Sequence, residues 1–385
     1  MSKLNRKKII LVITGTRAEY GLLKSTIDHI RSSKKLGLKL LATGMHTQKK
    51  YGYTLRDINK DSVPVDCVVK IGENDSMLQA LSREISGIEK YCVRHRPDII
   101  LVLGDRDEAF AGAIVGGHLN IPVAHIHGGD ISSGVVDDYI RHAITKFSHL
   151  HFTVSKYSQA RVLQLGEESW RVYNVGSPGL DNLATATYQS KKDLAKDMQL
   201  DPNKPWFVVL QHPTPLDPIS IKDQIIPTLQ AVSSFAAEKI VIYPNSDTGS
   251  NIFIKAIEQA SSKKGFHVYK SLPRAIYLSL LKTSDALIGN SSSGIIESGY
   301  FKLPTINIGK RQQGRECGQN VTHVGYNQNE IAKAIARSQS QEFSAICKKA
   351  GQPYGSGQAG KTIAAVLEKM PLGAKLLDKK FVYAK

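Results

Sequence analysis

A short polar stretch after an apolar run carries the first chemical signal in this sequence. Residues 286–288 are apolar, and Gly289-Asn290-Ser291-Ser292-Ser293-Gly294 follows, with a helix expected to begin at Gly294 or Ile295. Unpaired backbone N–H groups at such a helix start, beside the hydroxyls of Ser291 and Ser292, favour a bound phosphate. Glu297 lies further along, where its carboxylate can accept hydrogen bonds from ribose hydroxyls. A serine-rich helix cap without a ligand is the competing interpretation.

Carboxylates in the first half of the chain are candidates for proton transfer. Asp105 ends an apolar run, Asp130 follows His127-Gly128-Gly129, and Asp137 and Asp138 stand together shortly afterwards. Neighbouring carboxylates push their pKa values apart, so that one site can hold both an acid and a base near neutral pH. Capping of a helix is the alternative role of Asp137 and Asp138.

An arginine follows a glycine turn near the N-terminus. Gly15-Thr16-Arg17-Ala18-Glu19 comes directly after the first apolar run and opens a helix. Glycine allows a ligand to approach the backbone, and arginine can hold a diphosphate through two parallel hydrogen bonds. The G-x-G-x-x-G spacing of dinucleotide-binding proteins is absent, and an ordinary strand–helix turn is the alternative.

Two further patterns favour neither a metal nor an ATP site. His125 and His127 share one face of an expected strand, but no third ligand and no H-E-x-x-H pattern accompany them, so we expect no metal. Residues 355–362 fit the spacing of a phosphate-binding P-loop. The preceding residues predict a helix instead of the strand that a P-loop requires, so we do not expect an NTPase.

Composition limits the class of protein. The 385 residues are enough for two domains, and 41% hydrophobic with 22% charged residues is typical of globular proteins. The net charge of +17 suggests an anionic partner, either nucleic acid or an anionic small molecule. No nucleic-acid-binding signature is evident, so we expect no nucleic acid. Most of the charges are interpreted as a solvated basic surface, with focusing of an anionic substrate into a cleft as the second interpretation. No signal peptide or membrane span is evident, and four dispersed cysteines match no metal pattern. A cytoplasmic protein with reduced thiols is expected.

The expected elements alternate along the whole chain. Short runs rich in valine and isoleucine are separated by helix-length segments, which predicts an α/β fold with parallel sheets covered on both faces. Two such series in tandem indicate two doubly wound domains with a cleft between them. The boundary falls after Gly176-Ser177-Pro178-Gly179, giving domains 1–180 and 181–362. The expected strands are 9–13, 38–42, 99–103, 123–126, 151–154, 173–175, 207–210, 240–243, 267–269, 286–288 and 305–308.

Ligands of parallel sheets bind beyond the carboxyl ends of the strands. Nearly every expected strand places a small residue together with a charged or hydroxylic one at that end. These segments are Thr14-Gly15-Thr16-Arg17, Gly44-Met45-His46, Gly104-Asp105-Arg106-Asp107, His127-Gly128-Gly129-Asp130, Gln211-His212-Pro213, Pro244-Asn245-Ser246-Asp247 and Gly289-Asn290-Ser291.

As a set, several of these motifs resemble one known family. The motifs are Gly15 to Gly21, Gly104-Asp105-Arg106, His125 to Gly129, Asp137 to His142, Asn290 to Gly294 and Arg311-Gln312-Gln313-Gly314-Arg315. In this order they resemble the hydrolysing UDP-N-acetylglucosamine 2-epimerases of sialic-acid-type sugar biosynthesis. The resemblance implies two Rossmann-like domains of glycosyltransferase-B type, an interdomain cleft, and a C-terminal helix, 363–385, that packs back on the first domain.

The resemblance also implies a reaction. A base removes the proton from the second carbon of UDP-N-acetylglucosamine while UDP leaves, which gives 2-acetamidoglucal. Water then adds, and N-acetylmannosamine and UDP are released. The family needs no cofactor for this elimination and hydration, and its members are expected to be dimers or tetramers.

Residue roles follow motif by motif from the resemblance. Asp105 is a catalytic carboxylate, with Asp130, Asp137 and Asp138 as further candidates and His212 near the leaving group. The residues implied to bind substrate are Arg17, Arg106, His127, Asn245, Ser291, Ser292, Glu297 and Arg311.

Two departures from the family pattern leave alternatives open. Relatives often carry glutamate in place of Asp130, and some carry glutamate in place of His127. A side chain one methylene shorter moves an oxygen by about 1 Å, so which carboxylate is the base in each step stays open. The substrate alternative is UDP-2,4-diacetamido-2,4,6-trideoxyglucose, used for legionaminic-acid-type sugars. The functional alternatives are a non-hydrolysing epimerase, a glycosyltransferase of the same architecture, and a non-catalytic protein. The last would be a nucleotide-sugar sensor or a nucleic-acid-binding protein that uses the +17 charge.

Overall fold

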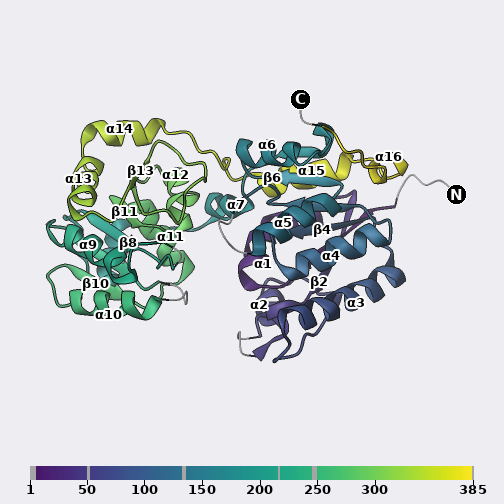
Figure 1. The fold of residues 1–385 in the computed structure, drawn as a ribbon, viewed down its shortest axis with the longest axis horizontal. Coiled ribbons are helices and arrows are strands. Elements are labelled where there is room, and N and C mark those ends of the chain that lie inside the picture. Colours follow the sequence, from purple (N-terminus) through teal and green to yellow (C-terminus); the bar gives the residue numbers. More distant parts are fainter. Residues whose placement is uncertain (1–5, 50–52, 132–135, 216, 245–248, 384–385) are drawn as a thin grey trace. The chain divides into compact units, whose positions relative to one another are not determined.

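The computed structural model describes residues 6–49, 53–131, 136–215, 217–244 and 249–383. The chain forms two compact units (Figure 1). The first unit contains Met1–Ala184 and Tyr354–Lys385, and the second contains Thr185–Pro353. Each unit is an α/β structure built on one parallel sheet.

The first unit has a seven-stranded parallel sheet in the order β3-β2-β1-β4-β5-β6-β7. The strand order reverses between β1 and β4, which are neighbours. The strands are β1 (Lys8–Thr14), β2 (Leu36–Ala42), β3 (Cys67–Val68), β4 (Ile99–Leu103), β5 (Val123–Ile126), β6 (Leu150–Thr153) and β7 (Val172–Asn174). Its helices are α1 (Arg17–Ser32), α2 (Leu55–Lys60), α3 (Met77–His95), α4 (Asp107–His118), α5 (Val136–Phe147), α6 (Lys156–Gln164), α7 (Pro178–Thr185), α15 (Ala359–Lys369) and α16 (Ala374–Leu377).

Alternating side chains of β1 fill two separate hydrophobic clusters. Ile10 and Val12 pack with residues of α1 and α15, whereas Leu11 and Ile13 pack with residues of α3, α4 and α5. A strand covered by helices on both faces is apolar at almost every position. The sheet lies between two layers of helices (Figure 1). This explains why residues 9–13 of β1 form a continuous apolar run.

The second unit has a six-stranded parallel sheet in the order β10-β9-β8-β11-β12-β13, which reverses between β8 and β11. Its strands are β8 (Trp206–Leu210), β9 (Glu238–Ile242), β10 (Phe266–Tyr269), β11 (Ala286–Gly289), β12 (Thr305–Ile308) and β13 (Val321–Val324). Its helices are α8 (Lys191–Met198), α9 (Ile221–Ser233), α10 (Ser250–Ala260), α11 (Arg274–Thr283), α12 (Glu297–Phe301), α13 (Gln328–Ser338) and α14 (Gln341–Lys349). The α14 helix precedes the P-loop-like residues, in agreement with the helix expected there.

The expected C-terminal helix over 363–385 is wrong in its extent. α15 begins earlier, at Ala359, because Asp181 accepts hydrogen bonds from the N–H groups of Ala359 (2.8 Å) and Gly360 (2.6 Å). It ends at Lys369, since Pro371 and Gly373 disfavour a continuing helix.

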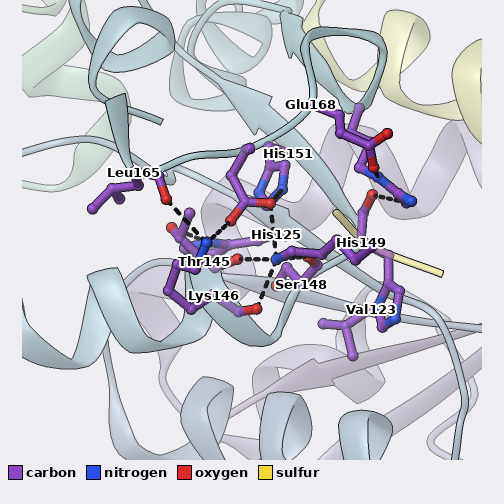
Figure 2. A network of polar contacts seen from close by, with 12 residues as sticks. Val123, His125, Thr145, Lys146, Ser148, His149, His151, Leu165 and Glu168 are labelled. Atoms are coloured by element: carbon purple, nitrogen blue, oxygen red, sulfur yellow. Dashed lines mark hydrogen bonds and ion pairs between the residues drawn. The ribbon is translucent and has the colours of Figure 1, made fainter. Parts of the chain in front are cut away.

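A buried polar network fastens the end of the chain to the first unit (Figure 2). Arg171 is fully buried and donates to the carbonyl oxygens of Leu376 (2.7 Å) and Asp378 (2.9 Å). Lys379 donates to the carbonyl oxygens of Lys146 and Ser148 at the C-terminal end of α5, each at 2.7 Å. Cations satisfy the unpaired carbonyl groups at a helix C-terminus, so the tail stabilises the far end of the helix that carries Asp137 and Asp138.

Candidate active site

Each sheet has one place where the strand order reverses, and ligands of doubly wound sheets bind outside the carboxyl ends of the strands there. In the first unit this place lies between β1 and β4, which Gly15 and Gly104 follow. In the second unit it lies between β8 and β11, which Gln211 and Asn290 follow. Many of the residues singled out from the sequence follow the carboxyl ends of these four strands.

Asp105 and Asp138 are joined by one arginine. Arg141 donates through Nη2 to Oδ2 of Asp105 and through Nη1 to Oδ1 of Asp138 at 3.5 Å. The arginine side chain is only 6% exposed, while the two carboxylates are 21% and 22% exposed. The guanidinium therefore holds two partly exposed carboxylates beyond the carboxyl ends of the strands.

Arg106 is fixed by a buried carboxylate. Its Nε donates to Oε1 of Glu108 at 3.0 Å, and Glu108 is 3% exposed. Burial by itself would lower the pKa of Arg106, but Glu108, Glu19 and Asp137 together raise it. A Cβ atom on Gly15 would lie 2.1 Å from Oε1 of Glu108, so only glycine leaves room for this pair. The guanidinium keeps a fixed charge on an accessible side chain, as an anion clamp requires.

Two more carboxyl groups are buried beside this pair. Burial raises the pKa of Glu84 to about 8, and the charge of Glu108 raises it further. Burial also raises the pKa of Glu19 well above its usual range, with Glu108 again adding to the shift. Glu84 is therefore largely protonated near neutral pH.

Replacing Glu84 by glutamine tests this protonation. Between its ordinary pKa of 4.5 and about 8, the folded protein binds a proton at Glu84 that the unfolded chain does not bind. The wild-type free energy of unfolding therefore falls as pH rises through that range, by about 1.4 kcal/mol per pH unit from this group. Urea unfolding at about pH 5.5 and about pH 7.5 should show Glu84→Gln gaining about 2 to 3 kcal/mol relative to wild type at the higher pH. The exposed Glu89→Gln on the same helix should gain nothing, and an equal result for both variants would contradict a neutral Glu84.

His127 and Asp130 form a hydrogen-bonded pair, and Asp130 accepts a further hydrogen bond from helix α6. His127 Nδ1 lies 2.8 Å from Oδ2 of Asp130, and Ser158 Oγ donates to Oδ1 of Asp130 at 2.6 Å. The backbone of His127 has φ +69°, which is uncommon for a residue other than glycine. Gly129 also has a positive φ, and a Cβ there would lie 2.2 Å from the carbonyl oxygen of Ser158.

His125 has a structural environment instead. It is fully buried, its Nε2 donates to the carbonyl oxygen of Gly104 at 2.7 Å, and its Nδ1 lies 3.2 Å from Oγ1 of Thr145. Burial lowers its pKa to about 3, so the ring is neutral. Among the described residues, no group of three or more histidine, cysteine, aspartate or glutamate side chains could hold a metal ion.

Arg17 lies at the start of α1 and extends outward. Its side chain is 76% exposed, and Nε is 3.3 Å from Oδ2 of Asp57. The structure thus leaves the guanidinium accessible to an anion, with a surface ion pair to Asp57.

In the second unit, Asn290 joins the two strands at the reversal point. Its Oδ1 accepts from the backbone N–H of His212 at 2.7 Å, and its Nδ2 donates to the carbonyl oxygen of His212 at 2.9 Å. Gly289 has φ +137°, and a Cβ there would lie 2.0 Å from the carbonyl oxygen of Leu210. The close approach of the two strand ends therefore requires glycine, and Asn290 fixes the backbone at His212.

The serine turn differs from its expected form. The predicted helix start at Gly294 or Ile295 is wrong, because a short 3₁₀ turn, Ser292–Gly294, comes first and α12 starts only at Glu297. Within this turn the N–H of Gly294 donates to Ser291 O, and the N–H groups of Ile295 and Ile296 donate to Ser292 O. These three N–H groups are thus satisfied internally, the first two by the three-residue spacing of a 3₁₀ turn and the third by the four-residue spacing of an α-helix. Hydroxyl groups, rather than these N–H groups, are what the turn offers a ligand.

Further polar side chains surround the serine turn. Ser291 Oγ lies 3.0 Å from Ser293 Oγ, which also bonds the hydroxyl of Tyr277. Arg311 and Gln312 both donate to the carbonyl oxygen of Asn290, at 3.3 and 2.9 Å. This places the cation of Arg311 beside the serine turn.

Glu297 carries a partner that the sequence did not indicate. Arg274, at the start of α11, donates through Nη2 to Oε1 of Glu297. The glutamate is 12% exposed and the arginine 57% exposed. The arginine fixes the carboxylate and leaves its other oxygen to accept hydrogen bonds from a ligand.

The structure therefore brings most candidates into two groups. The candidates that follow strands of the first sheet are Asp105, Arg106, His127, Asp130, Asp137 and Asp138. Those that follow strands of the second sheet are His212, Ser291, Ser292, Glu297 and Arg311. Asn245 lies outside the described residues. Sequence reasoning assigned no role to the side chains that hold the candidates: Arg141, Glu108, Ser158, Asn290 and Arg274. Arg141 and Asn290 stood in motifs singled out from the sequence, whereas Glu108, Ser158 and Arg274 had no local signal.

Comparison with known proteins identifies the family to which this arrangement belongs. The family profile described as UDP-N-acetylglucosamine 2-epimerase matches residues 28–368. The chain belongs to the UDP-N-acetylglucosamine 2-epimerase family. The expected resemblance is thereby confirmed at the level of the family.

Individual relatives can be aligned with this epimerase over almost its whole chain. The UDP-N,N'-diacetylbacillosamine 2-epimerase (hydrolyzing) of Legionella pneumophila is 33% identical over 96% of this chain and 98% of its own. The polysialic acid biosynthesis protein P7 of Escherichia coli is 38% identical over 90% of both chains. The crystal structure of UDP-GlcNAc 2-epimerase from Neisseria meningitidis bound to UDP-GlcNAc matches with a TM-score of 0.77 and 18% identity, over 94% of this chain and 100% of that one.

The fold class of this epimerase is also confirmed. Its two parallel sheets, each with a reversal of strand order, and the likeness to solved 2-epimerases agree with the predicted pair of Rossmann-like domains of glycosyltransferase-B type. Among the described residues, none of the helices is long and apolar enough to span a membrane.

Proposed function

We propose that this epimerase is of the hydrolysing type, and that it converts UDP-N-acetylglucosamine to N-acetylmannosamine and UDP. The family match supports a UDP-sugar 2-epimerase, and the name of the Legionella relative supports hydrolysis. The observation that carries the chemistry is the bridge from Arg141 to Asp105 and Asp138, which keeps two carboxylates at the edge of the first sheet.

The first unit supplies the groups for proton transfer in this proposal. Elimination breaks the C–H bond at the second carbon of the sugar, and its electrons form the double bond of 2-acetamidoglucal as UDP leaves from the first carbon. A base must accept that proton, and a proton must return to the opposite face when water adds. Inversion at the second carbon therefore needs two proton-transferring groups, and Asp105 is one of them in our proposal. Arg106 is proposed to stabilise negative charge that develops on the leaving diphosphate.

The second unit is proposed to hold the UDP. Ser291, Ser292 and Arg311 offer hydroxyls and a cation to the diphosphate, while Glu297 accepts hydrogen bonds from the ribose. His212, whose backbone is fixed by Asn290, is proposed to lie near the leaving phosphate.

Arg311→Ala tests the placement of UDP. Loss of one charge-assisted hydrogen bond to phosphate should weaken UDP binding about tenfold to a hundredfold. Isothermal titration calorimetry with UDP measures this directly. Arg337→Ala, an arginine of α13 whose guanidinium lies 4.7 Å from the centre of the Phe343 ring, is the matched control and should bind UDP as wild type does. Unchanged UDP affinity in Arg311→Ala would contradict the proposed site.

The choice of sugar has one specific alternative. The Legionella relative is named for UDP-N,N'-diacetylbacillosamine, the diacetamido-trideoxy sugar considered above. Release of UDP from each sugar, measured as kcat/KM in parallel, decides between them. We expect the larger value for UDP-N-acetylglucosamine. A larger value for the diacetamido sugar would keep the reaction and change the substrate, and turnover of neither would contradict the proposed function.

A further inference from the structure

His127 and His125 lie two residues apart but differ in their hydrogen bonding. Both ring nitrogens of His125 have partners, Gly104 and Thr145. His127 has Asp130 at Nδ1, whereas its Nε2 is buried and has no hydrogen-bond partner among the described residues. A buried polar atom without a partner costs free energy, so a vacant ring nitrogen calls for a functional explanation.

The hydrogen bonds around Asp130 indicate which nitrogen of the His127 ring carries the hydrogen. Ser155 Oγ lies 3.1 Å from Ser158 Oγ, and Ser158 in turn donates to Asp130 Oδ1. The other carboxylate oxygen of Asp130 accepts from His127 Nδ1. An ionised carboxylate only accepts hydrogen bonds, so next to it Nδ1 carries the hydrogen, and in the neutral form of the ring the lone pair is then on Nε2. This is the arrangement in which a carboxylate prepares a histidine to act as a base.

The backbone places His127 and Asp105 at the same level on neighbouring strands. In the register of β4 and β5, Leu103 pairs with Ile126, and the N–H of Gly104 donates to Ile126 O at 2.9 Å. His127 therefore follows β5 at the level where Gly104 and Asp105 follow β4. Its positive φ adds strain, which is found preferentially at functional sites.

We propose that His127 Nε2 is the base that accepts the proton from the second carbon of the sugar, with Asp130 as the positioning residue that orients the ring. The proposal rests on the proposed function. The C–H bond breaks toward Nε2, its electron pair forms the double bond between the first and second carbons, and the C–O bond to the diphosphate breaks with its electrons on UDP. The resulting imidazolium is stabilised by Asp130 and later returns its proton to solvent.

Removal of the imidazole and its chemical replacement test the proposal. With the UDP-sugar that wild type turns over, His127→Gln should lower kcat by about 10²-fold or more, while the Kd of UDP stays within about twofold. His127→Gly, which suits the positive φ, should be equally slow, and added imidazole should raise its kcat about tenfold or more. Imidazole should leave wild type and Asp105→Asn unchanged, and His118→Ala, at the end of α4, should retain wild-type turnover.

The partner residues give a second readout. Asp130→Asn should lower kcat about 10²-fold or more with little change in KM, because an amide can donate to Nδ1 and favour the wrong tautomer. If His127→Gln keeps more than about a tenth of wild-type kcat, or if imidazole fails to restore His127→Gly, the assignment of the base is wrong. A wild-type protein that turns over no UDP-sugar would instead contradict the proposed function itself.

Discussion

Asp105→Asn is expected to lower kcat by about 10³-fold while changing the Kd of UDP by no more than about twofold. Asparagine has nearly the shape of aspartate and keeps an oxygen that can accept from Arg141. It cannot take or give a proton in the reaction, so the loss should fall on turnover. Steady-state kinetics and calorimetry with UDP measure the two effects separately.

A surface carboxylate provides the control for Asp105. Asp28 on α1 pairs with Lys24 at 3.1 Å, and Asp28→Asn should leave both kcat and UDP affinity as in wild type. Turnover near the wild-type rate in Asp105→Asn would remove this carboxylate from the mechanism. Equal losses of turnover and UDP binding would indicate that the substitution disturbs the fold instead.

Arg141→Met is expected to have the second largest effect, on both turnover and stability. The substitution leaves Asp105 and Asp138 without the cation that joins them, and removing one partner of a largely buried ion pair typically costs about 3 to 5 kcal/mol. Because the carboxylates also lose their fixed positions, kcat should fall by about 10²-fold or more. Urea unfolding and steady-state kinetics measure the two losses.

Lysine at the same position separates charge from geometry. Arg141→Lys keeps the positive charge but lacks the planar fork that reaches two carboxylates at once. It should recover most of the stability and only part of the turnover. Wild-type turnover in Arg141→Met would show that the bridge plays no part in the reaction.

The central strands could be predicted from sequence because a buried parallel strand is apolar on both faces. Runs such as Ile99–Leu103 and Ala286–Ile288 therefore stand out, and the structure confirms them. β3 and β13 were missed because none of their residues is buried: Cys67 is half-buried, Val68 is exposed, and the residues of Val321–Val324 are half-buried or exposed. A strand with few buried residues carries little hydrophobic signal of its own.

The edges of the candidate site could be predicted more readily than the contacts within it. Residues at the carboxyl ends of strands, such as Asp105 and Ser291, follow from the topology of a parallel sheet. Their partners depend on which helix packs beside them: Arg141 lies 36 residues from Asp105, and Ser158 lies 28 residues from Asp130. Spacing along one chain does not encode such distant pairs. The 3₁₀ turn before Glu297 was missed because serine-rich helix starts and 3₁₀ turns share the same residues.

Proton NMR of the reaction in deuterated water tests the central claim most directly. A hydrolysing 2-epimerase that works by elimination must release free UDP and N-acetylmannosamine that carries deuterium at its second carbon. The proposed mechanism predicts this product from UDP-N-acetylglucosamine, or the corresponding deuterated sugar from the diacetamido substrate. Released sugar that keeps its original hydrogen at the second carbon would contradict elimination, and unchanged substrate with both sugars would contradict the proposed activity.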